Sequence, residues 1–353
     1  MTFEDILTRH TLPFSGAYSP EELIKVREEI REKIQKTEYG ILPSRPEHLS
    51  STVTSDDDRY AGGKARRTEI EIKLYNGTRT FAFSLTAIYP KKAERIPAII
   101  YIDGEGTIPN KYLPSEEIAD NGFALFSFYC EDITPDNPDF KGKLPKFLEI
   151  NRRLSTAPGK LMLWAYAAMR VMDYVEALDF IDKENTSVVG HARLGIAALL
   201  TAALDERFGC AISSSAPSRV IRGGRGIDVL NGSAHLFCPK YIKTLAKQGG
   251  TESDGVHLLS LIPPRRLVIG NAENDLTVNL ENEFSRLRSV SEIYNLYGLC
   301  GLIHEGGTPK APALLDEGNL CYYLREGESY LTRQDWHTYM NYIKKNTENK
   351  NDL

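Results

Sequence analysis

The sequence predicts an α/β fold in which a mostly parallel, twisted sheet carries helices on both faces. Short apolar segments typical of buried strands alternate with helical segments from residue 98 onward. Strands that alternate with helices pair in parallel and are covered on both sides. Ahead of them, two segments with period-two alternation flank the turn signal Asn76-Gly77, which predicts an antiparallel hairpin.

Residues 1–68 predict an N-terminal helical extension and strap, and residues 69–353 predict a single domain. Ser19 as N-cap, Pro20 in the first turn and two glutamates after it predict a helix that runs to about Lys36. Residues 43–68 are rich in Pro, Ser and Asp, so we expect an irregular surface strap there.

The elements of the domain are assigned from their apolar patterns. The expected strands are 69–74, 80–88, 98–102, 124–128, 186–189, 210–213, 266–269 and 290–297. The expected helices are 161–180, 194–204, 281–287 and 335–345. The first of these helices is apolar on most faces and is therefore expected to be buried.

Composition narrows the function classes. The 353 residues carry 43 basic and 48 acidic side chains, and the net charge of −5 argues against a generic nucleic-acid binder. Five widely spaced cysteines without a C-x-x-C pair predict free thiols and neither a disulfide frame nor a zinc site. The start of the chain shows no secretory pattern, and the longest apolar stretch is too short for a bilayer. We therefore expect a cytoplasmic protein that binds neither nucleic acid nor membrane, while its oligomeric state stays open.

The segment 186–195 is the most informative part of the chain. A short β-branched strand runs into a turn flanked by Gly190 and Gly195, and an alanine-rich helix follows. This pattern is typical of a nucleophile elbow, a strained turn that projects one small side chain above the sheet. The helix N-terminus behind such a turn offers N–H donors to an oxyanion. The projecting residue is Ala192, and an ordinary strand-to-helix connection is the alternative interpretation of this segment alone.

Further motifs follow in order along the chain. They include Ser127-Phe-Tyr-Cys-Glu-Asp-Ile133, 168–174, 205–208, Phe237-Cys-Pro239, 262–265, 272–276, 283–284, 324–327 and 331–336. As an ordered set, they resemble the bacterial glucuronoyl-esterase and acetyl-xylan-esterase-like branch of the α/β-hydrolases over roughly residues 80–345. The resemblance implies an α/β-hydrolase fold and serine ester hydrolysis, in which Ser attacks, His transfers the proton and an acid orients the His.

The resemblance also places the residues expected at the reacting positions. Ala192 stands where the family's elbow pattern Gly-His-Ser-Arg-Leu-Gly has its Ser. Ser329 stands where the family has its catalytic His, in the turn before the motif at 332–336. Glu273 and Asp275 occupy an acid position after the seventh strand. Alanine cannot form an acyl-enzyme and serine cannot replace an imidazole base, so conventional Ser–His hydrolysis is not expected.

Charged and aromatic side chains near the carboxyl ends of the strands are candidates for ligand binding. The predicted ligand-binding residues are Arg193, Arg219, Arg222, Arg225, Tyr129, His235 and His257. Guanidinium groups pair bidentately with carboxylates, so a uronate-like carbohydrate suits this set; a solvated basic loop is the alternative for 219–225. Asp103 and Glu105 are either turn residues or acid–base groups. No metal-ligand or phosphate-loop spacing is visible, so neither a metal nor a cofactor is predicted.

Three functions are compatible with these positions. The favoured one is a diverged hydrolase that binds an acidic, carbohydrate-like ligand without Ser–His hydrolysis. The second is a carboxylic-ester hydrolase whose nucleophile is replaced by Ala192 in this chain. The third is a pocket reused for non-hydrolytic chemistry on a uronate-like substrate, with Tyr129, Glu131, Asp275 and the arginines as the groups involved.

Overall fold

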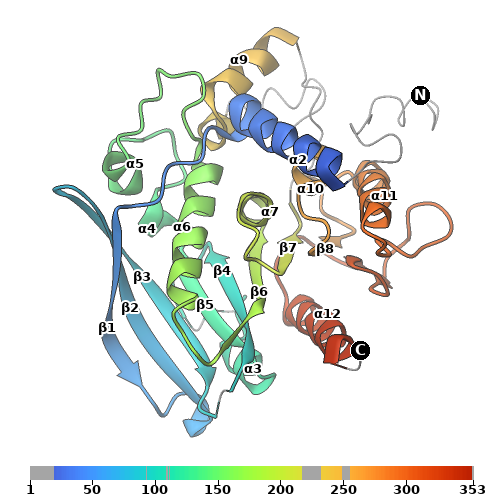
Figure 1. Cartoon of the computed structure of the whole chain (residues 1–353). Coiled ribbons are helices and arrows are strands. Elements are labelled where there is room, and N and C mark those ends of the chain that lie inside the picture. Colours follow the sequence, from blue (N-terminus) through green and yellow to red (C-terminus); the bar gives the residue numbers. More distant parts are fainter. Residues whose placement is uncertain are drawn as a thin grey trace.

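The computed structural model describes residues 20–92, 94–108, 110, 112–216, 232–248 and 255–351. These residues form a mixed ten-stranded sheet of order β1-β2-β3-β5-β4-β6-β7-β8-β10-β9 (Figure 1). The parallel strands are β4 (Ile96–Asp103), β5 (Ala124–Tyr129), β6 (Ile181–His191), β7 (Cys210–Ser214), β8 (Arg266–Ala272) and β10 (Leu320–Arg325). The predicted fold class, an α/β fold with a mostly parallel sheet, is confirmed. Of the parallel strands, β10 has no counterpart among the predicted ones.

Antiparallel strands lie at both edges of the sheet. At one edge these are β1 (His48–Asp57), β2 (Ala65–Asn76) and β3 (Arg79–Pro90), and at the other β9 (Ala313–Leu315). The predicted hairpin is confirmed, because β2 and β3 pair from Ala65 with Pro90 to Asn76 with Arg79. The expected boundary at residue 68 falls within β2.

The prediction of an irregular strap over residues 43–68 is wrong for 48–57, which form β1. This strand buries none of its side chains, and its pairing with β2 shifts register between Val53 and Ser55. Backbone hydrogen bonds to a neighbouring strand hold such an edge strand in place, so it needs no apolar face. Composition alone therefore gave no sign of it.

Helices cover both faces of the sheet. The described helices are α2 (Pro20–Ile34), α3 (Ser115–Asp120), α4 (Cys130–Ile133), α5 (Lys143–Phe147), α6 (Lys160–Val175), α7 (Arg193–Leu204), α9 (Pro239–Gln248), α10 (Val256–Leu259), α11 (Leu280–Leu296) and α12 (Arg333–Asn351). A π-helical turn, Gln35–Tyr39, continues α2, and short 3-10 turns lie at Ala61–Gly63 and Ala234–Leu236. One apolar core includes α6, α7 and α11, whereas a second core includes α3 and α12 on the other face (Figure 1). None of the helices in the described ranges is long and apolar enough to cross a membrane.

The prediction of a strand over 290–297 is also wrong, because residues 290–296 continue α11 and Tyr297 is its C-cap. The Asn279 side chain caps this helix by accepting a hydrogen bond from the Asn282 backbone N–H. Phe284, Leu287 and Val290 are buried at intervals of three residues, which is a helical spacing. The apolar residues within 290–297 belong to the end of this buried helical face. Taken without the preceding residues, their pattern is that of a buried strand.

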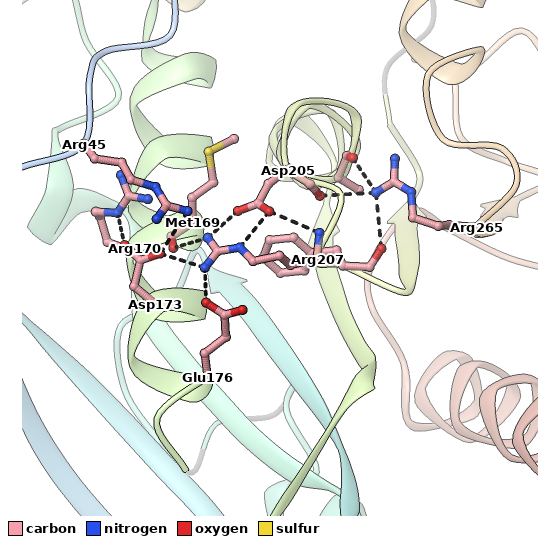
Figure 2. A network of polar contacts seen from close by, with 10 residues as sticks. Arg45, Met169, Arg170, Asp173, Glu176, Asp205, Arg207 and Arg265 are labelled. Atoms are coloured by element: carbon pink, nitrogen blue, oxygen red, sulfur yellow. Dashed lines mark hydrogen bonds and ion pairs between the residues drawn. The ribbon is translucent and has the colours of Figure 1, made fainter. Parts of the chain in front are cut away.

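Arg207 joins carboxylates of α6 to the turn that precedes β7 (Figure 2). Its Nη1 lies 2.8 Å from Asp173 Oδ1 and also pairs with Glu176, and its Nη2 lies 2.6 Å from Asp205 Oδ2. Arg265 donates to three backbone carbonyls within 202–208, at the C-terminal end of α7 and just beyond it. The network therefore fixes the end of α7 that is opposite to residue 192.

Replacing Arg207 tests this network. Arg207→Ala is expected to lower the free energy of unfolding by roughly 2–3 kcal/mol, because Asp205 stays partly buried without its cation and Asp173 keeps Arg170 as its main partner. Arg207→Lys should cause a smaller loss of stability than Arg207→Ala, since an ammonium group keeps the charge but not the planar arrangement of donors. The control is Lys64→Ala, which removes an exposed pair with Asp120 and should cost less than about 0.5 kcal/mol. Urea unfolding measures all three, and equal losses for Arg207→Ala and Lys64→Ala would contradict the assigned role.

Candidate functional site

Ala192 forms the sharp turn between β6 and α7. Its backbone has φ 52° and ψ −128°, a conformation that residues other than glycine rarely adopt. A Cβ on Gly190 would lie 2.1 Å from the Leu194 carbonyl oxygen, and one on Gly195 would lie 2.6 Å from Ser213 Oγ. Both flanking positions therefore need glycine, and the turn has the strained elbow geometry that the sequence predicts.

The elbow borders a cavity of about 300 Å³. Its lining residues are Tyr101, Gly104, Glu105, Tyr112, His191, Ala192, Arg193, Leu194, Ser329, Tyr330 and Leu331. Ala192, Arg193 and Ser329 thus share one cavity, although Ser329 is far from the other two in the sequence. Glu105 was predicted as either a turn residue or an acid–base group, and Tyr330 was absent from the predicted site residues. A carboxylate in the turn after a predicted strand was the sequence signal that pointed to Glu105. The only signal for Tyr330 was its position beside Ser329.

Arg325 and Asp335 shape the loop that carries Ser329. Arg325 Nε lies 3.1 Å from Asp335 Oδ1, and both residues are almost fully buried. Arg325 Nη2 donates to the carbonyl oxygens of Glu328 and Tyr330, at 2.8 and 2.5 Å. The loop therefore encircles a buried guanidinium group, and Ser329 is held between two carbonyls that Arg325 binds.

Arg193 is joined to His235 through a carboxylate that sequence analysis missed. Arg193 Nη2 lies 2.5 Å from Asp136 Oδ2, and His235 Nε2 lies 2.8 Å from Asp136 Oδ1. Partial burial opposes ionisation of Asp136, but the hydrogen bond with His235 and the charge of Arg193 outweigh it and lower its pKa. Half of the Arg193 side chain stays exposed, so the guanidinium can still meet a ligand from the cavity. No motif marked Asp136, because its role depends on contacts that are distant in sequence.

The two acidic candidates lie in the loop after β8, outside the cavity lining. Asp275 is buried; its Oδ1 accepts hydrogen bonds from Thr277 N and Oγ1 at 2.8 and 2.6 Å. Its Oδ2 has no hydrogen-bond partner among the residues that the structure describes. Glu273 is exposed, and its backbone N–H donates to the Arg325 carbonyl, which ties this loop to the one with Ser329. The loop at the predicted acid position therefore keeps its backbone hydrogen bond to Arg325, but one buried carboxylate oxygen of Asp275 has no partner among the described residues.

His191 is the histidine that lines the cavity in the described part of the chain. Burial lowers its pKa, and the charges of Asp335 and Asp275 only partly offset this, so a neutral imidazole is favoured. Its Nδ1 lies 3.3 Å from Ser214 Oγ. Ser214 is buried and does not line the cavity. This His–Ser contact therefore does not present a hydroxyl to a ligand.

Other predicted site residues lie elsewhere. Tyr129 lines a separate groove of about 460 Å³ together with Asp103 and does not reach the cavity beside Ala192. His257 does not line the cavity beside Ala192: it belongs to α10, where its Nε2 lies 3.3 Å from Lys33 Nζ of α2. The packing of α10 against α2, which the sequence pattern does not show, carries it away. Arg219, Arg222 and Arg225 lie outside the described residues.

Behind the acid loop, Glu283 of α11 is buried and accepts a hydrogen bond from Asn271 at the end of β8. Burial, together with the charge of Asp275, raises its pKa to about 7, although the charge of Arg286 and the hydrogen bond from Asn271 oppose this shift. No group of three His, Cys, Asp or Glu side chains within the described ranges is arranged to hold a metal ion.

The sheet order, the helices on both faces and the strained elbow define an α/β-hydrolase. Comparison with known proteins narrows this class. A family model described as glucuronyl esterase, fungi, matches residues 72–236. Carbohydrate esterase MZ0003, from an unknown prokaryotic organism, is 24% identical over 365 residues, which cover 90% of this chain and 83% of that protein.

Two solved structures extend the comparison. A glucuronoyl esterase from Solibacter usitatus has 25% sequence identity and a TM-score of 0.82, with 93% of this chain and 94% of that chain covered. A serine-to-alanine mutant of the Sporotrichum thermophile glucuronoyl esterase, solved with methyl 4-O-methyl-β-D-glucopyranuronate, has 21% identity and a TM-score of 0.63, with 92% and 83% covered. The chain is a glucuronoyl-esterase-like α/β-hydrolase.

The strain at residue 192 predicts that glycine is better there than alanine. Ala192→Gly should raise the free energy of unfolding by about 1 kcal/mol, because relief of the positive φ exceeds the added entropy of the unfolded chain. Ala98→Gly, at a buried position of β4, should instead lower it by about 1 kcal/mol. Thermal and urea unfolding measure both changes. Destabilisation by Ala192→Gly would show that the turn is not strained.

The pKa of Glu283 predicts a pH dependence of stability. Its folded pKa of about 7 exceeds the ordinary value of 4.5, so its contribution is complete below pH 4.5 and is lost as the pH rises through 7. Glu283→Gln cannot ionise, so its stability relative to the wild type should rise by about 2 kcal/mol between pH 5.5 and 8.

Asp56→Asn is the control, because the hydrogen bond with Arg66 lowers the pKa of Asp56 and neither group titrates between pH 5.5 and 8. It should show no such change within this pH window. Urea unfolding at several pH values measures the slopes, and parallel curves for Glu283→Gln and the wild type would contradict the assignment.

Proposed function

We propose that this protein binds a uronate-like carbohydrate in the cavity beside Ala192 and does not hydrolyse esters by a Ser–His mechanism. The observation that carries the proposal is that Ala192 occupies the strained elbow while Ser329 lines the same cavity. A methyl group offers no nucleophile, and a hydroxyl at position 329 offers no base near neutral pH. The elbow therefore keeps the shape of a hydrolase site without its reacting groups.

His191, which lines the cavity, does not replace the missing base. His191 lines the cavity, but its hydroxyl partner, Ser214, is buried outside it. The hydrogen bonds of the described residues include none between His191 and Ser329. A proton relay from a cavity hydroxyl to this imidazole therefore lacks the contact that general-base catalysis requires.

The cavity suits one sugar ring with a carboxylate or ester group. Its volume of about 300 Å³ is at the lower end of small-molecule sites, and tyrosine rings contribute to its walls. Arg193 supplies a guanidinium group that pairs with a carboxylate or a carbonyl oxygen. The related serine-to-alanine mutant that was solved with a glucuronate methyl ester supports binding at a site without the nucleophile.

Two alternatives make different use of the same site. If Ala192 merely replaces a nucleophile in an otherwise competent hydrolase, serine at this position restores turnover. If the pocket serves non-hydrolytic chemistry, acid–base groups must face the ligand. Tyr129 and Asp275, which were predicted for this chemistry, do not line the cavity, whereas Glu105 does, so the release of a product from a uronate glycoside decides between binding and this last alternative.

The test combines binding with reconstruction. Calorimetric titration with glucuronic acid, methyl glucuronate and glucose should show binding of the first two, and Arg193→Met should weaken it. Ester hydrolysis is then measured for the wild type, Ala192→Ser, and Ala192→Ser combined with Ser329→His. We expect Ala192→Ser to stay at the rate of the wild type and the double variant to exceed it by at least about 100-fold, because a general base contributes a factor of this order.

The outcomes separate the three functions. Turnover by Ala192→Ser alone would establish the replaced-nucleophile alternative. Release of a product from a uronate glycoside by the wild type would establish the non-hydrolytic alternative. Failure of both uronates to bind would overturn the proposed ligand class.

A further inference from the structure

A third cavity lies next to His235, away from the residues that line the cavity beside Ala192. It has a volume of about 390 Å³, and the two cavities share no lining residue. Most of its wall is apolar and is formed by the side chains of Pro138, Phe140, Pro239 and Ile242. A wall of this kind favours a ligand with an apolar body, because apolar surface on both sides leaves water on binding.

The polar residues that line this cavity carry no negative charge. They are Arg152, His235 and Lys243, and no aspartate or glutamate of the described chain lines the cavity. Lys243 is exposed and forms no ion pair with another described residue. His235 contacts Asp136, but this carboxylate is already paired with Arg193. The cavity therefore combines an apolar wall with an excess of positive charge.

Arg152 is held in this cavity by neutral groups. Its Nη1 donates to the carbonyl oxygens of Ala157 and Pro158 at 3.1 and 3.0 Å, and its Nη2 donates to that of Phe237 at 2.9 Å. Burial lowers the pKa of Arg152, and no carboxylate of the described chain forms an ion pair with it. An arginine side chain has five N–H donors, so two of them are left for a ligand. The carbonyls thus fix the guanidinium group without neutralising it.

A second cation adds to this positive charge. Lys160 Nζ lies 4.1 Å from the centroid of the Phe140 ring, and the guanidinium carbon of Arg152 lies 4.5 Å from the same centroid. Lys160 is buried, and burial lowers its pKa to about 8; the charge of Asp139 opposes this shift, whereas that of Arg152 adds to it. Two cations therefore repel each other beside one aromatic ring. An anion bound in the cavity is attracted to both of them.

We propose that this cavity is a second ligand site, which binds a carboxylate attached to an apolar ring. The carboxylate accepts hydrogen bonds from the remaining donors of Arg152 and from the ammonium group of Lys243. The apolar ring packs against Phe140 and the two prolines of the wall. A sugar ring suits the site poorly, because its hydroxyl groups face apolar walls without hydrogen-bond partners. The inference is independent of the proposed function, since it concerns another cavity and another class of ligand.

The experiment titrates the full chain with benzoate and with benzyl alcohol, which keeps the ring but lacks the charge. Calorimetry should give a Kd of about 1 mM or lower for benzoate, as expected of so small a ligand. Benzyl alcohol should bind at least about tenfold more weakly, because it forms no charge-assisted hydrogen bond. No binding of benzoate, or equal binding of the two compounds, would overturn the inference.

A matched pair of charge reversals on α9 tests the role of Lys243. Lys243→Glu should weaken benzoate binding at least about tenfold, because it replaces an attraction with a repulsion at the carboxylate. Lys247→Glu makes the same change at an exposed position of the same helix that does not line the cavity, so it should keep the affinity. Equal losses in both variants would reduce the effect to net charge and contradict the site.

Two space-filling variants locate the bound ring. Pro138→Trp fills the proposed site from an exposed position and should abolish benzoate binding, whereas Ser329→Trp fills the cavity beside Ala192 and should leave it unchanged. Thermal unfolding shows that both variants are folded. The reverse result would place benzoate in the cavity beside Ala192 and overturn the second site. Glucuronic acid takes no part in these titrations, so the proposed function stands or fails separately.

Discussion

The buried ion pair of Arg325 and Asp335 is the interaction on which the candidate site depends. Removing two charges from water is costly, and attraction between them repays the cost only when the remaining donors and acceptors are also bonded. Arg325 meets this condition, because its Nη groups donate to the carbonyls of Glu326, Glu328 and Tyr330. Asp335 also accepts from Thr332 N at the start of α12. One pair thus joins the last parallel strand, the site loop and the last helix.

The elbow shows how a site can keep its shape apart from its chemistry. Gly190 and Gly195 pack too closely against Leu194 and Ser213 for any side chain, so the backbone path at residue 192 is set by its neighbours. The strain at Ala192 is therefore a consequence of packing rather than of a reactive group. The position of Asp275 is likewise set by packing. Its loop is hydrogen-bonded to the Ser329 loop, while one of its carboxylate oxygens has no partner in the described chain.

Sequence reasoning reached the fold and part of the site. The alternation of buried strands and helices was sufficient for the fold class and for most of the parallel strands, since both patterns are local, but β1 and β10 were missed. Ala192 and Ser329 were reached through motif positions, and the cavity they share agrees with that reasoning. Asp136 and Tyr330 were missed as site residues, because the contacts that bring them to the site join segments that are distant in the sequence. The position of His257 also depends on distant contacts, since only tertiary packing brings α10 to α2.

The polar strand β1 has a consequence for the outer boundary of the molecule. A strand at the edge of a sheet presents unpaired N–H and C=O groups that another chain can extend. Here the irregular register between Val53 and Ser55, together with Asp56 and Asp57 at the end of the strand, breaks the flat, neutral template that such growth requires. The residues that form no part of the core therefore protect the sheet from aggregation along this edge.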